Sequence, residues 1–216
     1  MRQRLAAEFF GTFCLVFAGT GAIIVNDVSG GAVSHVGIAL TFGLVVLAMI
    51  KAVGDVSGAH FNPAVTLGFL LAGRFERQAV LPYVLSQVAG ACAASGLLRV
   101  LFPEHPTLGA TLPTGSAAQA FVFELLLTAI LMFTILNVSS GAQERGITAG
   151  IAIGAVIALE AMFAGPISGA SMNPARSLAP AVLSGSYHSL WIYLLAPAVG
   201  ALAGVAAFRA VRDEAA

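Results

Sequence analysis

Charged side chains are scarce in this sequence. Asp, Glu, Lys and Arg make up 9% of its 216 residues, whereas they make up about 25% of a typical soluble domain. Hydrophobic residues account for 58%, and the mean hydropathy is +0.93. This composition argues against a water-soluble globule and predicts one membrane domain over residues 1–216. Ten basic residues balance ten acidic ones, so the chain lacks the positive field that attracts nucleic acids, and we expect no nucleic-acid partner.

Cysteine is equally scarce. Cys14 and Cys92 each lie alone in an apolar run, without a nearby Cys or His at metal-ligand spacing. Neither a disulfide framework nor a zinc site is indicated. We expect no metal site.

Six stretches are apolar enough and long enough to cross a bilayer, which takes about 20 residues each. We place transmembrane helices near residues 5–25, 35–53, 80–101, 117–137, 146–165 and 188–210. The start Met-Arg-Gln-Arg followed by apolar residues is similar to a signal peptide, but Glu8 interrupts the apolar run. We therefore expect the first segment to be retained as a span.

Two further segments share the pattern Ser-Gly-Ala-x-x-Asn-Pro-Ala, at 57–64 and 168–175. Asn62 and Asn173 stand where a helix N-cap belongs, and proline is favoured at the position that follows. The expected half-helix starts are Pro63, Ala64, Pro174 and Ala175. About 11 helical residues, roughly 16 Å, would reach halfway across the hydrocarbon. The predicted fold class is an all-α membrane protein with six transmembrane helices and two re-entrant half-helices.

The chain is built from two similar halves. Ala7-Glu8-x-x-x-Thr12-x-x-Leu15 has a counterpart in Phe123-Glu124-x-x-x-Thr128-x-x-Leu131. Prolines between 102 and 113 separate the halves, so we assign repeats 1–105 and 114–216. Each repeat has three full spans, an odd number. The second repeat must therefore be inverted relative to the first, and the half-helices enter from opposite faces.

Basic residues predict the orientation, because cytoplasmic loops carry the excess of Lys and Arg. With the N-terminus inside, only Arg99 and Arg176 fall outside. Eight basic residues then fall on the cytoplasmic side: Arg2, Arg4, Lys51, Arg74, Arg77, Arg145, Arg209 and Arg212. We expect a multi-pass protein of the cell membrane with both termini in the cytoplasm.

The two half-helix starts predict the chemistry of the centre. Each N-terminus carries roughly half a positive charge, so their meeting point repels cations. Each Asn cap uses its carbonyl oxygen on its own helix, and we expect its amide NH2 to be free to donate into a shared lumen. Irregular backbone at this depth lines wet cavities. We therefore expect exposed carbonyls at 54–61 and 165–172, and a path for small neutral solutes.

Five other polar residues complete the expected site. Arg176, on the first turn of the second half-helix, would place positive charge at the outer entrance. Glu8 and Glu124 occupy matching positions, and we expect them to accept hydrogen bonds from backbone N–H groups of the irregular segments; a general acid/base pair is the alternative. His60 either lines the inner vestibule or is a structural histidine. Glu160 has no counterpart in the first half, and it either pairs with a loop, faces a neighbouring subunit or touches solute.

With its doubled Asn-Pro-Ala pattern and Arg176, the sequence resembles the aquaporins, the major intrinsic protein family, over about residues 4 to 210. The resemblance implies an hourglass fold, a homotetramer with one pore per subunit, and passive conduction across the lipid bilayer. It implies no cofactor and no catalytic residue. It also implies a narrowest filter at Phe42, Ala161, Ala170 and Arg176. Water-selective members usually carry His at the position of Ala161, so a wider filter is expected here.

The segment from Ala164 to Ser177 and the run Trp191-Ile192-Tyr193-Leu194 look most like the nodulin-like branch and its bacterial relatives. This resemblance implies water and small uncharged solutes, with glycerol and boric, silicic or arsenous acid as candidates. A strictly water-selective aquaporin is the first alternative, because Ser177 follows Arg176 where glycerol facilitators typically have Asp, and Phe42 keeps one side of the filter aromatic.

Two alternatives from other classes remain. An inverted-repeat secondary transporter also uses broken helices at the midplane, but it needs a coupling-ion site, and here the caps are Asn. An intramembrane hydrolase is suggested by Ser171 and His60, although nothing in the sequence orients His60 as a base.

Overall fold

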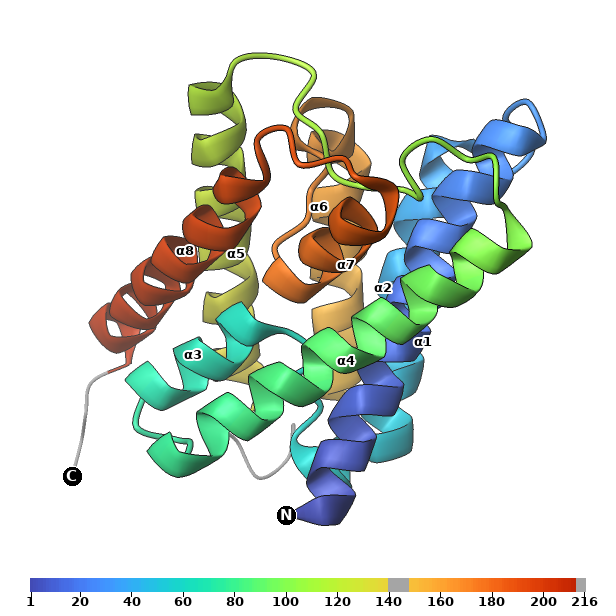
Figure 1. Ribbon diagram of the computed structural model, residues 1–216. Helices are drawn as coiled ribbons and strands as arrows, with labels where there is room; N and C mark the ends of the chain where they lie inside the picture. The colour runs from blue at the N-terminus through green and yellow to red at the C-terminus, as the bar shows by residue number, and fades with distance from the viewer. Residues whose placement is uncertain (140–147, 213–216) are drawn as a thin grey trace.

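The computed structural model describes residues 1–139 and 148–212, which form eight α-helices (Figure 1). Six of these helices are long and apolar enough to cross a membrane. They are α1 (Arg2–Val28), α2 (Ser34–Ser57), α4 (Arg77–Leu101), α5 (Ala117–Val138), α6 (Thr148–Ser168) and α8 (Leu190–Val211). The predicted all-α class and the six spans are confirmed, and the first segment is a continuous helix of 27 residues. Arg145 and residues 146–147 lie outside the described residues.

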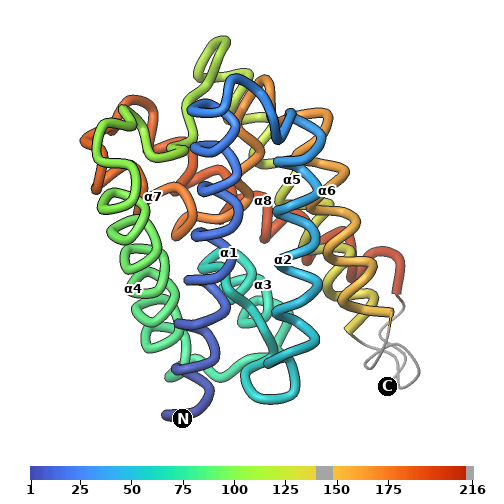
Figure 2. The backbone as a smooth tube through the Cα atoms, turned by 90° about the vertical axis from the view of Figure 1, so that its right-hand side faces the viewer, coloured from blue at the N-terminus to red at the C-terminus, as the bar shows by residue number. Residues whose placement is uncertain are grey.

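The two remaining helices are the half-helices. α3 (Pro63–Leu71) has 9 residues and α7 (Pro174–Ser184) has 11. At 1.5 Å per residue they are roughly 14 and 16 Å long, about half the thickness of the hydrocarbon core. α3 lies in the half of the molecule that holds the start of α1 and the end of α8, and α7 lies in the opposite half (Figures 1 and 2). The half-helices therefore approach the centre from opposite ends.

Helix packing follows the internal repeat. α1 packs on α4 and α2, whereas α5 packs on α8 and α6. The half-helices are exchanged between the halves, because α3 also packs on α8 and α7 also packs on α4. α2 and α6 meet directly and join the two halves. The inverted-repeat architecture is thus present, while the division at 105 and 114 stays a prediction.

Small residues allow the long helices to approach closely. A Cβ added at Gly154 of α6 would lie 2.6 Å from the carbonyl oxygen of Gly43 on α2. The reverse holds for Gly43, whose added Cβ would overlap the carbonyl oxygen of Gly154. Gly200 and Gly204 of α8 are similarly close to the backbone of α5. The α2–α6 contact therefore depends on having no side chain at Gly43 or Gly154.

We predict that Gly154→Ala destabilises the protein, because its methyl group would overlap a backbone atom that cannot rotate away. The expected cost is about 1–3 kcal/mol, seen as a lower melting temperature of the detergent-solubilised protein. Gly96→Ala on α4 is the matched control, because an added Cβ there meets nothing within 4 Å. Since alanine favours the helix by up to about 1 kcal/mol over glycine, Gly96→Ala should melt at the same or a higher temperature. Equal melting temperatures for the two variants would contradict the close packing.

Candidate functional site

Two short loops lead into the half-helices, at 58–62 and 169–173. They are shorter than the expected segments 54–61 and 165–172, so that expectation was wrong for the first four positions of each. The helices continue because the N–H of Gly58 donates to the carbonyl of Gly54 (2.8 Å) and the N–H of Gly169 to that of Gly165 (3.0 Å). A glycine costs a helix only about 1 kcal/mol relative to alanine, so the packed helices run through Gly54 and Gly165.

Both loops have the same unusual backbone. A left-handed φ costs a residue with a side chain roughly 1–3 kcal/mol, and it persists only where the surroundings enforce it. Such φ values occur at three matching positions in each loop: Gly58, Ala59 and Phe61, and Gly169, Ala170 and Met172. The surroundings of both loops must therefore hold them in place.

Glu8 of α1 holds the first loop. Its carboxylate is fully buried and accepts hydrogen bonds from the N–H groups of His60 (2.9 Å) and Phe61 (2.7 Å). The hydroxyl of Ser57 donates to it at 2.7 Å and the amide of Gln87 at 2.8 Å. Four donors satisfy this buried group, which would otherwise be costly to remove from water.

Glu124 of α5 holds the second loop in the same way. Its buried carboxylate accepts from the N–H groups of Ser171 (2.9 Å) and Met172 (2.8 Å) and from the hydroxyl of Ser168 (2.8 Å). The contacts of Glu8 and Glu124 are those expected of carboxylates that brace the loops. Their contribution to conduction stays a prediction.

Two tyrosines that sequence reasoning missed secure the loop entrances. The hydroxyl of Tyr83 donates to the carbonyl of Ser57 (2.9 Å), and that of Tyr193 donates to the carbonyl of Ser168 (2.6 Å). Both rings are fully buried. A signal was available, because the tyrosines follow these serines by nearly the same interval, in the last full span of each half.

Asn62 and Asn173 cap the half-helices as predicted. The side-chain oxygen of Asn62 accepts from the N–H of Ala64 at 2.8 Å. That of Asn173 accepts from the N–H groups of Ala175 (3.0 Å) and Arg176 (3.3 Å). Pro63 and Pro174 follow in the first helical position, where a missing N–H costs nothing.

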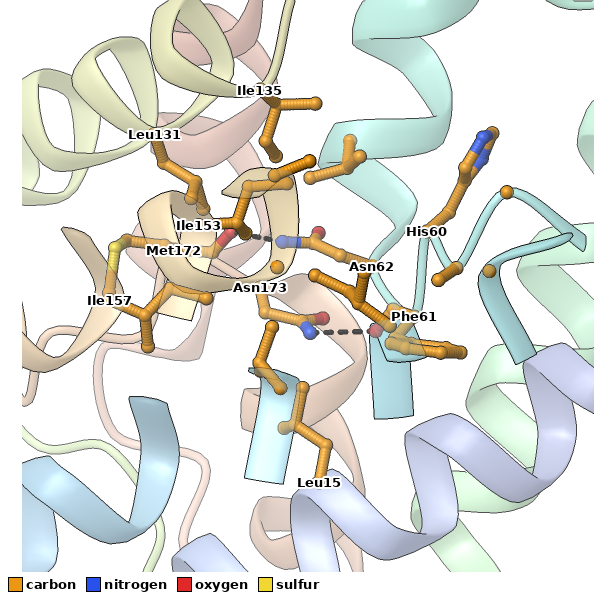
Figure 3. Close-up of a pocket in the computed structure, with 18 of the residues that line it drawn as sticks. Leu15, His60, Phe61, Asn62, Leu131, Ile135, Ile153, Ile157, Met172 and Asn173 are labelled. Carbon is orange, nitrogen blue, oxygen red and sulfur yellow. Dashed lines mark hydrogen bonds between the residues drawn. The ribbon is translucent and has the colours of Figure 1, made fainter. Parts of the chain in front are cut away.

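The amide groups of the two caps reach across to the opposite loop (Figure 3). Asn62 Nδ2 donates to the carbonyl of Met172 (2.7 Å), and Asn173 Nδ2 donates to the carbonyl of Phe61 (2.9 Å). The expectation of entirely free amides was therefore wrong: one N–H of each NH2 is used between the halves. An NH2 group has two N–H bonds, so one remains on each cap.

A single cavity of about 690 Å³ borders both asparagines. Toward the end that holds the start of α1 it is lined by polar residues that include Lys51, Asp55 and Arg74. Near the asparagines its walls are largely apolar (Figure 3), formed by Leu15, Leu131, Ile135, Ile153 and Ile157. The cavity thus combines a few fixed polar groups with apolar walls.

The four expected filter residues also line this cavity: Phe42, Ala161, Ala170 and Arg176. The Arg176 side chain is buried, and its Nη1 donates to the carbonyl of Gly109 at 3.0 Å. Its guanidinium lies over the Phe42 ring, 5.2 Å from the centroid, within the range of a cation–π interaction. Sequence reasoning did not identify Gly109, which the loop between α4 and α5 brings within hydrogen-bond distance of Arg176.

His60 borders the cavity and is also well packed. Its Nδ1 is 3.1 Å from the hydroxyl of Thr66, and its ring contacts those of Phe69, Phe75 and Tyr83. The hydroxyl of Ser171 donates to the carbonyl of Asn173 (3.0 Å) rather than pairing with His60. The Ser/His pair that a hydrolase would need is therefore not formed by these two residues.

Glu160 of α6 is 1% exposed, and neither carboxylate oxygen has a hydrogen-bond partner among the described residues. It does not line the cavity. Of the three roles left open for Glu160, contact with solute in this cavity and a hydrogen bond to a described loop are both disfavoured.

Comparison with known proteins adds independent information. Residues 1–208 match the family described as Major intrinsic protein. The chain is 49% identical to "Aquaporin NIP1-1" of Zea mays and 46% identical to "Nodulin-26" of Glycine max, each over 97% of this chain and 75% and 78% of the relative. Among solved structures, the aquaglyceroporin from Plasmodium falciparum superposes with a TM-score of 0.88 at 26% identity, covering 97% of this chain and 96% of that one.

We predict that Glu124→Gln loosens the second loop. A glutamine can still accept from one N–H, but its NH2 would face the N–H of Ser171 or Met172 and leave it unpaired, at about 1–3 kcal/mol. The melting temperature should fall, and the amides of 171 and 172 should exchange hydrogen faster. Glu104→Gln, at an exposed turn residue, is the control and should change neither. Unchanged exchange at 171 and 172 in Glu124→Gln would show that the carboxylate does not hold the loop.

Proposed function

Because the chain belongs to the major intrinsic protein family, whose members are membrane channels for water and small neutral solutes and not enzymes, we propose that the cavity around Asn62 and Asn173 is its pore. The observation that carries this proposal is the pair of cross-bonds at 2.7 and 2.9 Å, which bring both half-helix starts to one cavity. We further propose that the pore conducts glycerol and small uncharged acids, such as boric, silicic or arsenous acid, besides water.

The centre of the pore favours neutral solutes. Each half-helix start carries roughly half a positive charge, and two such ends at the midplane repel hydronium and metal ions. The remaining N–H of each asparagine donates to the oxygen of a passing molecule. A water molecule held by both donors has its lone pairs occupied, so it cannot accept a proton from its neighbour in the file. Protons are thereby excluded along with other cations.

The filter supports a solute range wider than water. Ala161 and Ala170 line the cavity with small side chains, while Arg176 supplies hydrogen-bond donors and Phe42 an apolar face. A polyol presents hydroxyl groups on one side and C–H groups on the other, which suits this asymmetry. A strictly water-selective pore is the alternative. It would require the constriction at Ala161 and Ala170 to be as narrow as it would be with a histidine at position 161.

The arrangement of charges supports the topology that we propose, with both termini in the cytoplasm. The start of α1 and the end of α8 lie at the same end of the molecule (Figure 1), and basic residues concentrate there, in accord with the positive-inside rule. We also propose a homotetramer with one pore per chain. Large apolar side chains are exposed along α2 and α6, among them Leu40, Leu44, Ile151 and Leu159; lipid or neighbouring subunits would cover them.

Passive conduction is distinguished from secondary transport by its indifference to ion gradients. A transporter needs carboxylates that coordinate the coupling ion near the centre, whereas Glu8 and Glu124 accept several hydrogen bonds each from the protein. In proteoliposomes, glycerol flux down its own gradient should be the same with and without an imposed sodium or proton gradient. Uphill glycerol accumulation driven by either ion would overturn the proposal.

We predict that Ala161→His narrows the filter, because the imidazole would occupy space beside Phe42 and Arg176. Glycerol permeability should fall roughly tenfold or more, corresponding to about 1.4 kcal/mol of added barrier, while water permeability stays within about twofold. Stopped-flow light scattering on proteoliposomes measures both quantities. Ala149→His is the matched control, because Ala149 lines the same cavity from the same helix near the opposite end. If glycerol passes equally well through wild type and Ala161→His, Ala161 does not form the constriction.

A further inference from the structure

One hydrogen bond joins α2 and α6 near the filter and has no part in the proposed conduction path. Nε2 of His35, on the first turn of α2, lies 2.7 Å from the carbonyl oxygen of Met162 on α6. A carbonyl oxygen only accepts, so Nε2 must carry the proton and donate. Met162 directly follows the filter residue Ala161.

The carbonyl of Met162 is available because of Pro166. In an α-helix the carbonyl of residue 162 accepts from the N–H of residue 166, but a proline has no N–H. Pro166 lies inside α6, so its regular partner is missing and the Met162 carbonyl requires another donor. His35 supplies that donor from the neighbouring helix.

The missing side chain of Gly165 leaves space for the His35 ring. A Cβ added at Gly165 would lie 2.9 Å from Cε1 of His35, so a larger residue at 165 would push the imidazole away. Pro166 removes the donor within the helix, and Gly165 makes room for a donor from outside it. Gly165, Pro166 and His35 thus form a second contact between α2 and α6.

This contact lies eight residues along each helix from the close approach of the same two helices. Gly43 of α2 faces Gly154 of α6; moving eight residues back along α2 reaches His35, and eight residues forward along α6 reaches Met162. In an antiparallel pair these steps travel the same distance in the same direction. The helices are therefore fixed at two levels, and the filter residues Phe42 and Ala161 belong to the segments between them.

We propose that His35 is a positioning residue that sets the size limit of the filter. It acts through α6: the bond to Met162 keeps the segment that carries Ala161 against α2, which carries Phe42. Without the bond, the end of α6 beyond Gly154 is free to move away from α2, and the gap between Phe42 and Ala161 widens. This inference rests on the proposed filter and adds a residue outside the pore that controls its width.

The test compares His35→Leu, which removes the donor, with His35→Gln, whose Nε2 can still reach the carbonyl. Water, glycerol and erythritol permeabilities are measured in proteoliposomes. We expect His35→Leu to raise the erythritol-to-water ratio roughly fivefold, the change expected for the loss of one hydrogen bond, and His35→Gln to restore the wild-type ratio. His188→Leu, at an exposed histidine before α8, is the matched control and should leave the ratio unchanged.

A second variant separates positioning from general destabilisation. Pro166→Ala returns an N–H to α6, so the Met162 carbonyl regains its partner within the helix. In that background His35→Leu should change the erythritol-to-water ratio less than about twofold, because the lost bond is already replaced. An unchanged ratio in His35→Leu alone, or an equal effect with and without Pro166→Ala, would overturn the inference.

Failure of the proposed function gives a different pattern. A wild-type protein that conducts water but no glycerol would refute the proposed solute range alone. The role of His35 would then still be read from whether His35→Leu, and not His35→Gln, admits glycerol. If neither does, His35 does not set the width of the filter.

Discussion

Two buried carboxylates determine how the centre of this molecule is built. A carboxylate in a low-dielectric interior is costly unless several donors satisfy it. Glu8 and Glu124 each obtain two donors from consecutive backbone N–H groups, which the left-handed residues of the loops direct toward them. Without the carboxylate, nothing would offset the strain of the left-handed loop residues. Without the loop, the carboxylate would lose two of its hydrogen-bond donors. Each therefore stabilises the other, and both loops have a defined shape before any solute arrives.

The fixed loops in turn connect the two halves of the chain. Glu8 accepts from the N–H of Phe61, and the carbonyl of the same residue accepts from Asn173 in the other half. Likewise, Glu124 accepts from the N–H of Met172, and the carbonyl of Met172 accepts from Asn62 in the first half. Each half thus orients the helix cap of the other, so a shift in one loop would displace the opposite asparagine. A preorganised site of this kind suits passive conduction, because its donors are in place without a conformational change.

Much of this architecture could be predicted from the sequence, since it depends on local rules. Apolar length marks the six spans, and Asn followed by Pro marks the half-helix starts because capping and the fixed φ of proline act within one turn. Contacts between distant segments were not predictable. The bonds from the asparagines to Phe61 and Met172, and the bond from Arg176 to Gly109, join residues that only the folded chain brings together. The exact ends of α2 and α6 also depend on tertiary packing. The bond between His35 and Met162 belongs to the same class.

Different interactions fix the centre and the proposed filter. Hydrogen bonds fix the centre, whereas the packing of separate elements fixes the filter. At the centre, the donors are set by backbone geometry and by buried carboxylates, so one substitution there would disturb several hydrogen bonds at once. The proposed filter instead gathers Phe42 from α2, Ala161 from α6, Ala170 from a loop and Arg176 from α7, and a separate loop supplies the carbonyl of Gly109. Its width depends on how these elements pack. In the proposed pore, repacking α2 against α6 would therefore change the width of the filter without moving the donors at the centre.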